Sequence, residues 1–324
     1  MKENMLRWLG VVCLVILLTS CTTQVSRVEK KIESLESLEK VEIGYKKHLA
    51  YLPLFIGLEK GFFTEEKLEV QIVPFDSTNQ MVTAVATGKI DAAIGGANLE
   101  AILSLEEKSP GSLKVFTTQR VTRDSRISCV LVKSDSTMDN IKDLKGKNIA
   151  TLPGTFAPLW IKATLKTIGI GMDEVQVQGI DPKLQLSSLE TGKVDALFAV
   201  EPICSFGVNK KMAKIIYEEP VKNLLTTFAG SALSSELFQK DPKTARKIIK
   251  ATDKSIEYMR ENPSETIEIL AKHTGYERSL LKGIKIPSYA TSSEITREEL
   301  EEVAETLYAE GIIKEKNVAG LIYS

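Results

Sequence analysis

The chain has 324 residues, of which 43% are hydrophobic and 26% are charged, and its formal net charge at pH 7 is −1. This length suits about two domains, and the composition is that of an ordinary globular protein. A net charge this close to zero leaves no basic face for a phosphate backbone, so we expect no nucleic-acid partner. The chain has two histidines, His48 and His273, and no paired-cysteine spacing, so we expect neither a metal nor a cofactor.

The N-terminal residues predict an export signal that ends at a lipidated cysteine. A weakly positive start is followed by an apolar segment, residues 8–18, which is too short to anchor the chain across a bilayer. The next residues, Leu18-Thr19-Ser20-Cys21, resemble a bacterial lipobox. We therefore predict a signal peptide over 1–20, a lipid on Cys21, and a location on the extracytoplasmic face of the cell membrane. A plain signal peptide or a short membrane anchor is the alternative.

Residues 21–40 are mostly polar and charged, and we interpret them as a solvated tether. A first α/β lobe is expected to begin at residue 41 and to continue to residue 130. Its expected strands are 41–45, 70–74, 90–94 and 113–118, with a further strand at 129–133. Its expected helices begin near Pro53 and after Asp76-Ser77-Thr78, and a third follows Gly95-Gly96-Ala97-Asn98.

A repeated hexapeptide predicts a second lobe of the same kind. The sequence Thr87-Gly88-Lys89-Ile90-Asp91-Ala92 returns at residues 191–196 with Val in place of Ile, and each copy lies between a helical pattern and a buried strand. The separation is too long for a solenoid repeat, which falls between about 20 and 50 residues. Two similar lobes that face each other across a cleft are the simpler interpretation.

The second lobe is expected over residues 131–227, and the chain should then return to the first lobe over 228–324. We expect the two crossings near 129–134 and 225–231. The second lobe should contain a strand at 148–151, a turn at 153–155 and a helix at 157–167. Three amphipathic helices are expected near the C-terminus, at 241–261, 263–273 and 296–310.

Candidate ligand contacts follow from this predicted topology. In open α/β sheets, ligands bind beyond the carboxyl ends of the strands, where helix N-termini favour anionic groups. This rule selects Tyr45, Lys47, His48, Tyr51, Ser77, Gly96, Ala97, Asn98, Arg120, Thr122, Thr155, Phe156 and Glu201.

Each of these residues also has a purely structural interpretation. Thr155 is the best single candidate because Gly154 permits close backbone approach, yet a helix cap explains it equally well. The aromatic residues could stack on a flat ligand or simply belong to a surface loop. Arg120 could neutralise an anion or lie in solvent, and Glu201 could bind a ligand amine or brace the hinge.

The remaining motifs argue against catalysis. The sequence contains no Gly-x-Ser-x-Gly elbow, no Walker-type phosphate loop and no His-Glu-x-x-His motif. We therefore expect a protein that is not an enzyme. Cys129 and Cys204 are expected to be two buried thiols, although a disulfide between them stays open.

The run from Gly44 to Phe63, followed by residues 84–93, resembles the substrate-binding proteins of nitrate, sulfonate and taurine ABC importers. The related thiamine-precursor-binding proteins share this pattern. Landmarks of the second lobe match at residues 144–150, at Pro153-Gly154-Thr155 and at 195–202, so the resemblance covers about residues 41–324.

The resemblance implies a type 2 periplasmic-binding-protein clamshell, in which each lobe is a mostly parallel sheet flanked by helices. It further implies a monomer that binds a small anionic or heteroaromatic nutrient and delivers it to an ABC permease driven by an ATPase. The yeast pyrimidine synthase related to these proteins carries cysteines and iron-binding histidines that this chain lacks. The alternatives are an extracytoplasmic enzyme and a sensory or adaptor lipoprotein on the same fold.

Overall fold

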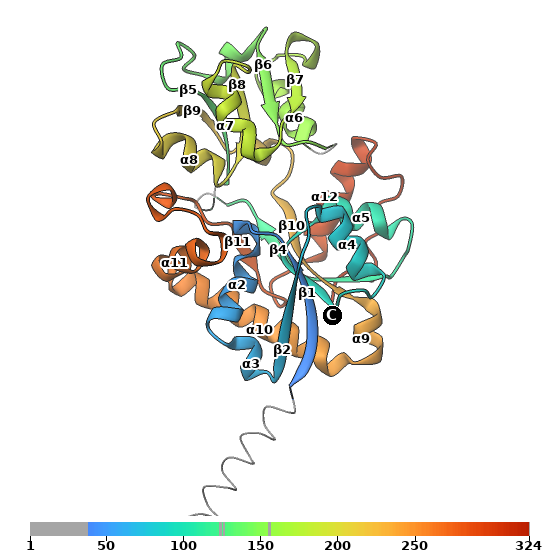
Figure 1. Ribbon diagram of the computed structural model, residues 1–324. Coiled ribbons are helices and arrows are strands. Elements are labelled where there is room, and N and C mark those ends of the chain that lie inside the picture. The colour runs from blue at the N-terminus through green and yellow to red at the C-terminus, as the bar shows by residue number, and fades with distance from the viewer. Residues whose placement is uncertain (1–37, 123–124, 126, 155–156, 324) are drawn as a thin grey trace, which may run out of the picture.

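Two mixed sheets, one in each of two lobes, organise the chain in the computed structural model, which describes residues 38–122, 125, 127–154 and 157–323 (Figure 1). The predicted two-lobed α/β architecture is confirmed. The predicted signal peptide, Cys21 and most of the tether lie outside the described residues.

The sheet of the first lobe has the order β11-β4-β10-β3-β1-β2 among the described residues. Its strands are β1 (Glu39–Tyr45), β2 (Leu68–Pro74), β3 (Ala92–Asn98), β4 (Leu113–Arg120), β10 (Thr227–Ser234) and β11 (Ser288–Ala290). β1 pairs in parallel with β2 and β3, whereas β10 is antiparallel to both β3 and β4.

The sheet of the second lobe has the order β7-β6-β8-β5-β9 in the part of the chain that is described. Its strands are β5 (Ser128–Lys133), β6 (Asn148–Thr151), β7 (Gln176–Gly179), β8 (Ala196–Val200) and β9 (Ala213–Glu218). β6 pairs in parallel with β7 and β8, and β5 is antiparallel to β8 and β9. The two sheets thus share one plan. Counted from β2 in one sheet and from β7 in the other, the fourth strand, β10 or β5, is antiparallel to its neighbours and is the one that arrives from the other lobe.

Helices cover both sheets. In the first lobe they are α2 (Leu52–Glu59), α3 (Phe62–Glu65), α4 (Thr78–Ala86), α5 (Leu99–Glu106), α9 (Ser235–Lys240), α10 (Pro242–Glu261), α11 (Pro263–Thr274) and α12 (Arg297–Ala309). In the second lobe they are α6 (Ala157–Thr167), α7 (Pro182–Glu190) and α8 (Ile203–Asn209). Short 3-10 turns complete the list: η1 (Leu49–Tyr51), η2 (Ile141–Leu144), η3 (Met172–Glu174), η4 (Pro220–Asn223) and η5 (Arg278–Leu281). In the described ranges, no helix has the length and apolar character needed to cross a membrane.

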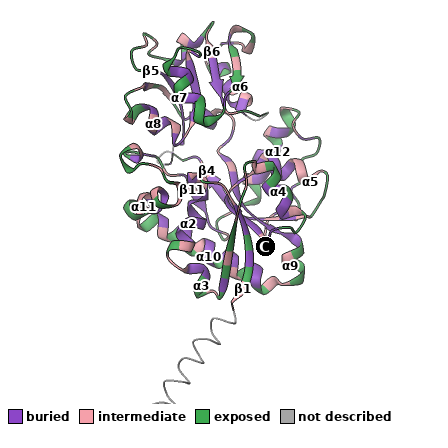
Figure 2. Ribbon diagram, in the orientation of Figure 1, coloured by how far each residue is buried: buried purple, intermediate pink, exposed green. Residues whose placement is uncertain are grey.

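Each lobe has its own hydrophobic core, which Figure 2 shows as buried strands beneath helices with exposed outer faces. Alternation along β8 divides the second core between the two faces of its sheet, since side chains point to opposite faces in turn. Phe198 packs with Trp160 of α6 on one face, whereas Leu197 and Ala199 pack on the other. A sheet covered on both sides makes this lobe an independent packing unit.

The repeated hexapeptide has the same structural task in both lobes. Gly88 and Gly192 have φ values of 65° and 72°, a conformation that ends α4 and α7 without strain. The aspartate that follows then binds the first parallel strand of its sheet: Asp91 Oδ2 accepts from the amide of Glu42 at 2.8 Å, and Asp195 Oδ2 accepts from that of Asn148 at 2.8 Å. In each lobe, the glycine of the repeat therefore ends a helix, and the aspartate holds a neighbouring strand through a hydrogen bond. We call this the strand-anchor role of the aspartate.

Two predicted boundaries need correction. β3 continues to Asn98 instead of ending at Ile94, because β10 pairs with it as far as the Ala229–Asn98 register. The register shifts between Gly230 and Ala232, opposite Gly95-Gly96, and there the hydroxyl of Ser231 accepts from the amide of Gly95 at 2.9 Å. β5, which begins at Ser128, lies wholly in the second sheet, a little ahead of the expected boundary at residue 130.

Candidate functional site

The first lobe reaches the second through the turn that follows β1. His48 precedes η1, and its Nε2 lies 3.1 Å from the carbonyl oxygen of Glu201, the residue that follows β8. The His48 Nδ1 accepts from the amide of Ala50 at 3.2 Å. Nε2 therefore carries the proton and donates it across the two lobes.

The surroundings of His48 favour its neutral form. The pKa of His48 is lowered to about 4, mainly by burial and also by the nearby positive charge of Lys46, while the bond to Glu201 opposes the shift. Both nitrogens of the neutral ring make hydrogen bonds, one within the turn and one to the second lobe. His48 therefore connects the two lobes.

Two glycines let η1 approach β3 closely. Gly95 has a φ of 95°, and a Cβ on it would lie 2.2 Å from the carbonyl oxygen of Ala50. A Cβ on Gly96 would lie 2.5 Å from the ring of Tyr51. Tyr51 is 2% exposed, its hydroxyl donates to the carbonyl of Gly96 at 3.2 Å, and burial raises its pKa. This packing fixes the turn that holds His48.

Glu201 is connected in two directions. Its backbone carbonyl faces His48, while its carboxylate accepts from the amide and the hydroxyl of Ser205 at 3.0 and 2.9 Å. Burial raises the pKa of Glu201, and the bonds from Ser205 oppose that shift. The carboxylate thus fixes the beginning of α8 relative to the end of β8.

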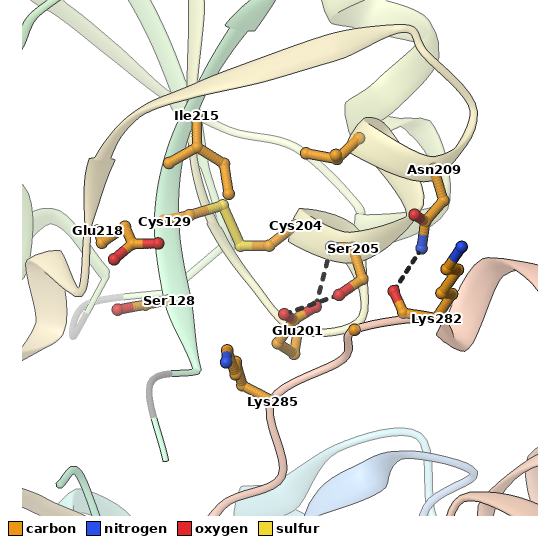
Figure 3. A pocket seen from close by; sticks show the side chains of 12 residues that line it. Ser128, Cys129, Glu201, Cys204, Ser205, Asn209, Ile215, Glu218, Lys282 and Lys285 are labelled. Carbon is orange, nitrogen blue, oxygen red and sulfur yellow. Dashed lines mark hydrogen bonds between the residues drawn. A yellow bond between two sulfur atoms is a disulfide. The ribbon is translucent and has the colours of Figure 1, made fainter. Parts of the chain in front are cut away.

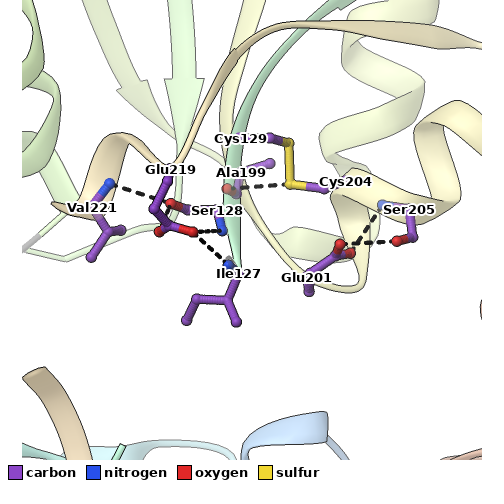
Figure 4. Close-up of a disulfide and its surroundings, with 9 residues drawn as sticks. All are labelled: Ile127, Ser128, Cys129, Ala199, Glu201, Cys204, Ser205, Glu219 and Val221. Carbon is purple, nitrogen blue, oxygen red and sulfur yellow. Dashed lines mark hydrogen bonds between the residues drawn. A yellow bond between two sulfur atoms is a disulfide. The ribbon is translucent and has the colours of Figure 1, made fainter. Parts of the chain in front are cut away.

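A second buried carboxylate joins the two crossover segments (Figure 4). Glu219 follows β9, and its Oε2 accepts from the amide of Ile127 at 2.6 Å while its Oε1 accepts from the hydroxyl of Ser128 at 2.5 Å. In the same two segments, the amide of Val121 donates to the carbonyl of Thr226 at 2.7 Å. The outward and return segments therefore act as one connection between the lobes.

A pocket of about 240 Å³ opens where the lobes meet on the α8 side (Figure 3). The second lobe supplies an apolar wall that includes Val208 and Ile215, and the carboxylates of Glu201 and Glu218. The first lobe supplies Lys282 and Lys285. The full lining is Ser128, Cys129, Glu201, Cys204, Ser205, Val208, Asn209, Ile215, Glu218, Lys282, Gly283 and Lys285. The shape of a pocket with walls from both lobes depends on how the lobes meet.

Among the predicted contacts, the structure brings together His48 with Glu201 and Tyr51 with Gly96. Ala97 is buried in β3. Tyr45 is half-buried and packs edge-on against the ring of Phe55, with centroids 6.0 Å apart. Lys47 is exposed, and its carbonyl accepts from the hydroxyl of Tyr276 at 3.2 Å.

Other residues that were predicted to contact a ligand instead interact with nearby residues of the protein. Ser77 is half-buried at the start of α4, and Asn98 Oδ1 accepts from the amide of Glu100 at 2.9 Å to cap α5. Arg120 forms an ion pair with Glu299 and donates to the carbonyl of Glu294 at 2.8 Å. The hydroxyl of Thr122 lies 2.7 Å from that of Ser125. Thr155 and Phe156 lie outside the described residues, so ligand contact stays a prediction for the whole set.

The expectation of two free thiols is wrong. Cys129 of β5 and Cys204 of α8 form a disulfide with an S–S distance of 2.07 Å (Figure 4). Both cysteines are buried as predicted, but their pairing depends on how α8 packs against β5, which no local pattern reports. Sequence reasoning also missed Glu219, Lys282 and Lys285, which lie in connections without a motif.

The described residues contain no group of three or more His, Cys, Asp or Glu side chains that could hold a metal ion. The polar groups at the lobe junction include the imidazole of His48, amides, hydroxyls, carboxylates and lysines. Such groups can bind a small polar molecule through hydrogen bonds and charge.

Comparison with known proteins identifies one family model and several distant relatives. A family model described as NMT1/THI5 like matches residues 48–266. A Bacillus subtilis protein whose name assigns it to aliphatic sulfonates is 22% identical over 76% of this chain and 73% of its own length. A Saccharomyces cerevisiae 4-amino-5-hydroxymethyl-2-methylpyrimidine phosphate synthase is 21% identical over 66% of this chain and 64% of its own length.

A solved structure shares the fold. The alkanesulfonate-binding protein of Xanthomonas axonopodis pv. citri, bound to MOPS, superposes with a TM-score of 0.70. The identity is 19%, and the match covers 88% of this chain and 98% of that one. The predicted periplasmic-binding-protein fold is thereby confirmed.

Proposed function

Because the chain belongs to the NMT1/THI5-like family, we propose that it is the extracytoplasmic solute-binding component of an ABC importer. It binds a small anionic or heteroaromatic nutrient between its lobes and presents the closed form to a permease, which an ATPase drives. Cys21 carries the lipid that holds it at the membrane surface. This function requires no bond-making, only a higher affinity of the closed arrangement for the ligand.

The observation that carries this proposal is the bond between His48 and Glu201. It joins the turn after β1 to the residue after β8, so equivalent ends of the two sheets meet at one place. Ligands of open α/β sheets bind at such ends. A solute held there would touch both lobes and stabilise the arrangement in which they meet.

Lys46 supports an anionic ligand. It lies in the same turn as His48 and is half-buried, and burial lowers its pKa while the charge of Asp76 opposes the shift. A cation held partly out of water gains from a bound anion because charge interactions strengthen as the effective dielectric falls. The names of the Bacillus subtilis and Xanthomonas axonopodis proteins point to sulfonates, and we favour a sulfonate as the ligand class.

Calorimetry with a defined panel tests this proposal. The detergent-purified chain is titrated with ethanesulfonate, taurine, nitrate and a 4-aminopyrimidine, and then the Lys46→Met variant is titrated with the solute that binds. A charge-assisted hydrogen bond contributes about 1.5–3 kcal/mol, so we expect roughly ten- to a hundredfold weaker binding of the anion. Lys40→Met is the matched control, because Lys40 is exposed on β1.

Unchanged affinity in Lys46→Met would contradict the anionic site. Binding of the aminopyrimidine alone would place the ligand in the heteroaromatic class. An enzyme on the same fold is the alternative, because the Saccharomyces cerevisiae relative is named as a synthase. Conversion of a bound solute to a new product, followed by mass spectrometry, would favour that alternative.

A further inference from the structure

α8 belongs to the second lobe, but two of its side chains contact the first lobe. Phe206 packs against the core of the first lobe, and its ring meets that of Tyr276 edge-on with centroids 5.3 Å apart. The Nδ2 of Asn209 donates to the carbonyls of Leu280 and Lys282, both at 2.9 Å. One short helix therefore makes an aromatic contact and two hydrogen bonds across the lobe boundary.

The partner segment is itself fixed to the site. The hydroxyl of Tyr276 donates to the carbonyl of Lys47, in the same turn as His48. Residues 276–282 thus link α8 to the turn that meets Glu201. Movement of α8 relative to the first lobe must alter both contacts.

The disulfide determines where α8 lies. Cys204 is the second residue of α8, and its bond to Cys129 attaches the helix to β5, which pairs with both β8 and β9. The bonds between Glu201 and Ser205 hold the same helix end from the other direction. α8 therefore moves with the sheet of the second lobe as one body.

Among the described residues, the contact on the opposite side of the lobe junction is an ion pair. α6 and α12 lie on the side away from α8 (Figure 1). There, Lys162 of α6 forms an ion pair with Glu310, just beyond α12, at 2.6 Å, with side chains 54% and 25% exposed. Exposed ion pairs contribute little because water screens them. The contacts on the α8 side combine ring packing with neutral hydrogen bonds and are less sensitive to salt.

We infer that α8 is an interlobe clamp, seated by the Cys129–Cys204 disulfide, in which Phe206 and Asn209 are positioning residues that set how the lobes meet. The clamp holds the α8 side together while the α6 side opens and closes. This goes beyond the proposed function, and rests on it only where ligand affinity is the readout.

Hydrogen exchange of the full chain in detergent tests the clamp without any ligand. The variant is Asn209→Leu, which keeps the side-chain size and removes both donors. The control is Asn223→Leu: Asn223 is also half-buried, and its Nδ2 donates to the Thr164 and Tyr217 side chains at 3.0 and 3.1 Å, both within the second lobe. The readout is exchange at the amides of Leu280 and Ile284, which are bonded within their own turn.

We expect roughly tenfold faster exchange of these amides in Asn209→Leu, a change of about 1.4 kcal/mol in the opening equilibrium, and no change in Asn223→Leu. The paired Cys129→Ala, Cys204→Ala variant should accelerate the same amides, and adding Asn209→Leu to it should have little further effect, because both changes release one contact. Unchanged exchange at Leu280 and Ile284 in Asn209→Leu would overturn the clamp. If the effects of Asn209→Leu and of removing the disulfide on these exchange rates are fully additive, the role of the disulfide is overturned.

Ligand affinity provides a second readout that a purely structural role would leave unchanged. With ethanesulfonate as probe, Asn209→Leu should bind more weakly than Asn223→Leu although both unfold at similar temperatures. If ethanesulfonate binds to none of the proteins, the choice of ligand class fails, and the exchange result still decides the clamp.

Discussion

The Nε2 of His48 lies 3.1 Å from the carbonyl oxygen of Glu201, 153 residues further along the chain. His48 follows β1 of the first sheet, and Glu201 follows β8 of the second sheet. This bond makes the protonation state of one histidine part of the lobe junction. Protonation would place a second N–H on Nδ1, where the amide of Ala50 already donates.

His48 should therefore make stability depend on pH. Its pKa falls from 6.5 to about 4 in the folded chain, so the unfolded chain takes up a proton first as the pH falls. The stabilisation is complete above about pH 6.5 and is lost as the pH falls towards about 4. A shift of this size corresponds to something on the order of 3 kcal/mol.

The control for this prediction is His48→Gln, which can still donate to Glu201 but does not titrate. Urea unfolding at about pH 7 and about pH 4.5 gives the difference between the two proteins. Taking that difference removes the opposite contribution of Glu201, whose raised pKa favours the folded chain at low pH. Parallel pH profiles for both proteins would show that His48 has the same pKa in the folded and unfolded chains, and would contradict the prediction.

The two aspartates of the repeated hexapeptide should contribute equally to stability. Asp91→Ala and Asp195→Ala each leave one strand amide, of Glu42 or of Asn148, without its carboxylate acceptor. Each should lower the free energy of unfolding by about 1–3 kcal/mol. Asp135→Ala is the control, because the contact that the described residues show for Asp135 is an exposed ion pair with Lys133 at 3.5 Å. A loss of unfolding free energy no larger than that of Asp135→Ala would contradict the strand-anchor role of the aspartates.

The lipid prediction concerns residues outside the described ranges. Cys21 follows two small residues at the end of an apolar segment, so Cys21→Ser should prevent lipidation. We expect the variant to leave the membrane fraction or to keep its signal uncleaved, as shown by fractionation and intact-mass measurement. A processed N-terminus with unchanged membrane fractionation would contradict the assignment.

Thr155 stays the best sequence-based candidate for ligand contact. Gly154 beside it has a φ of 119°, with no heavy atom within 4 Å of a Cβ built on it, so the backbone there is open to close approach. Thr155→Val should weaken binding of the solute identified by calorimetry by roughly ten- to a hundredfold if its hydroxyl bonds a charged group. The melting temperature should stay near that of the unchanged protein. Equal affinity in the two proteins would remove Thr155 from the site.

Local patterns were sufficient to predict the two lobes. The hexapeptide indicates a helix end, a tight turn at glycine and the start of a buried strand within six residues, and it does so twice, so the repeated lobe could be predicted directly. The amphipathic pattern of α10, with Ile248, Ile256 and Met259 buried, is equally local. Such features do not depend on distant partners.

Features that depend on distant partners were missed. β3 extends through Gly95 and Gly96 because β10 pairs with it. The disulfide joins residues 75 positions apart and depends on how α8 packs against β5. His48 and Glu201 were both selected as ligand contacts, but their bond to each other follows from the relative position of two lobes. Patterns within one segment carry no information about such contacts.

The most direct test of the central claim is hydrogen exchange with and without the solute that calorimetry identifies. A solute that binds between the lobes should slow exchange at both 45–51 and 201–206, segments that belong to different lobes, and it should be recovered unchanged after unfolding. Protection confined to one lobe, or recovery of the solute as a different compound, would contradict the account.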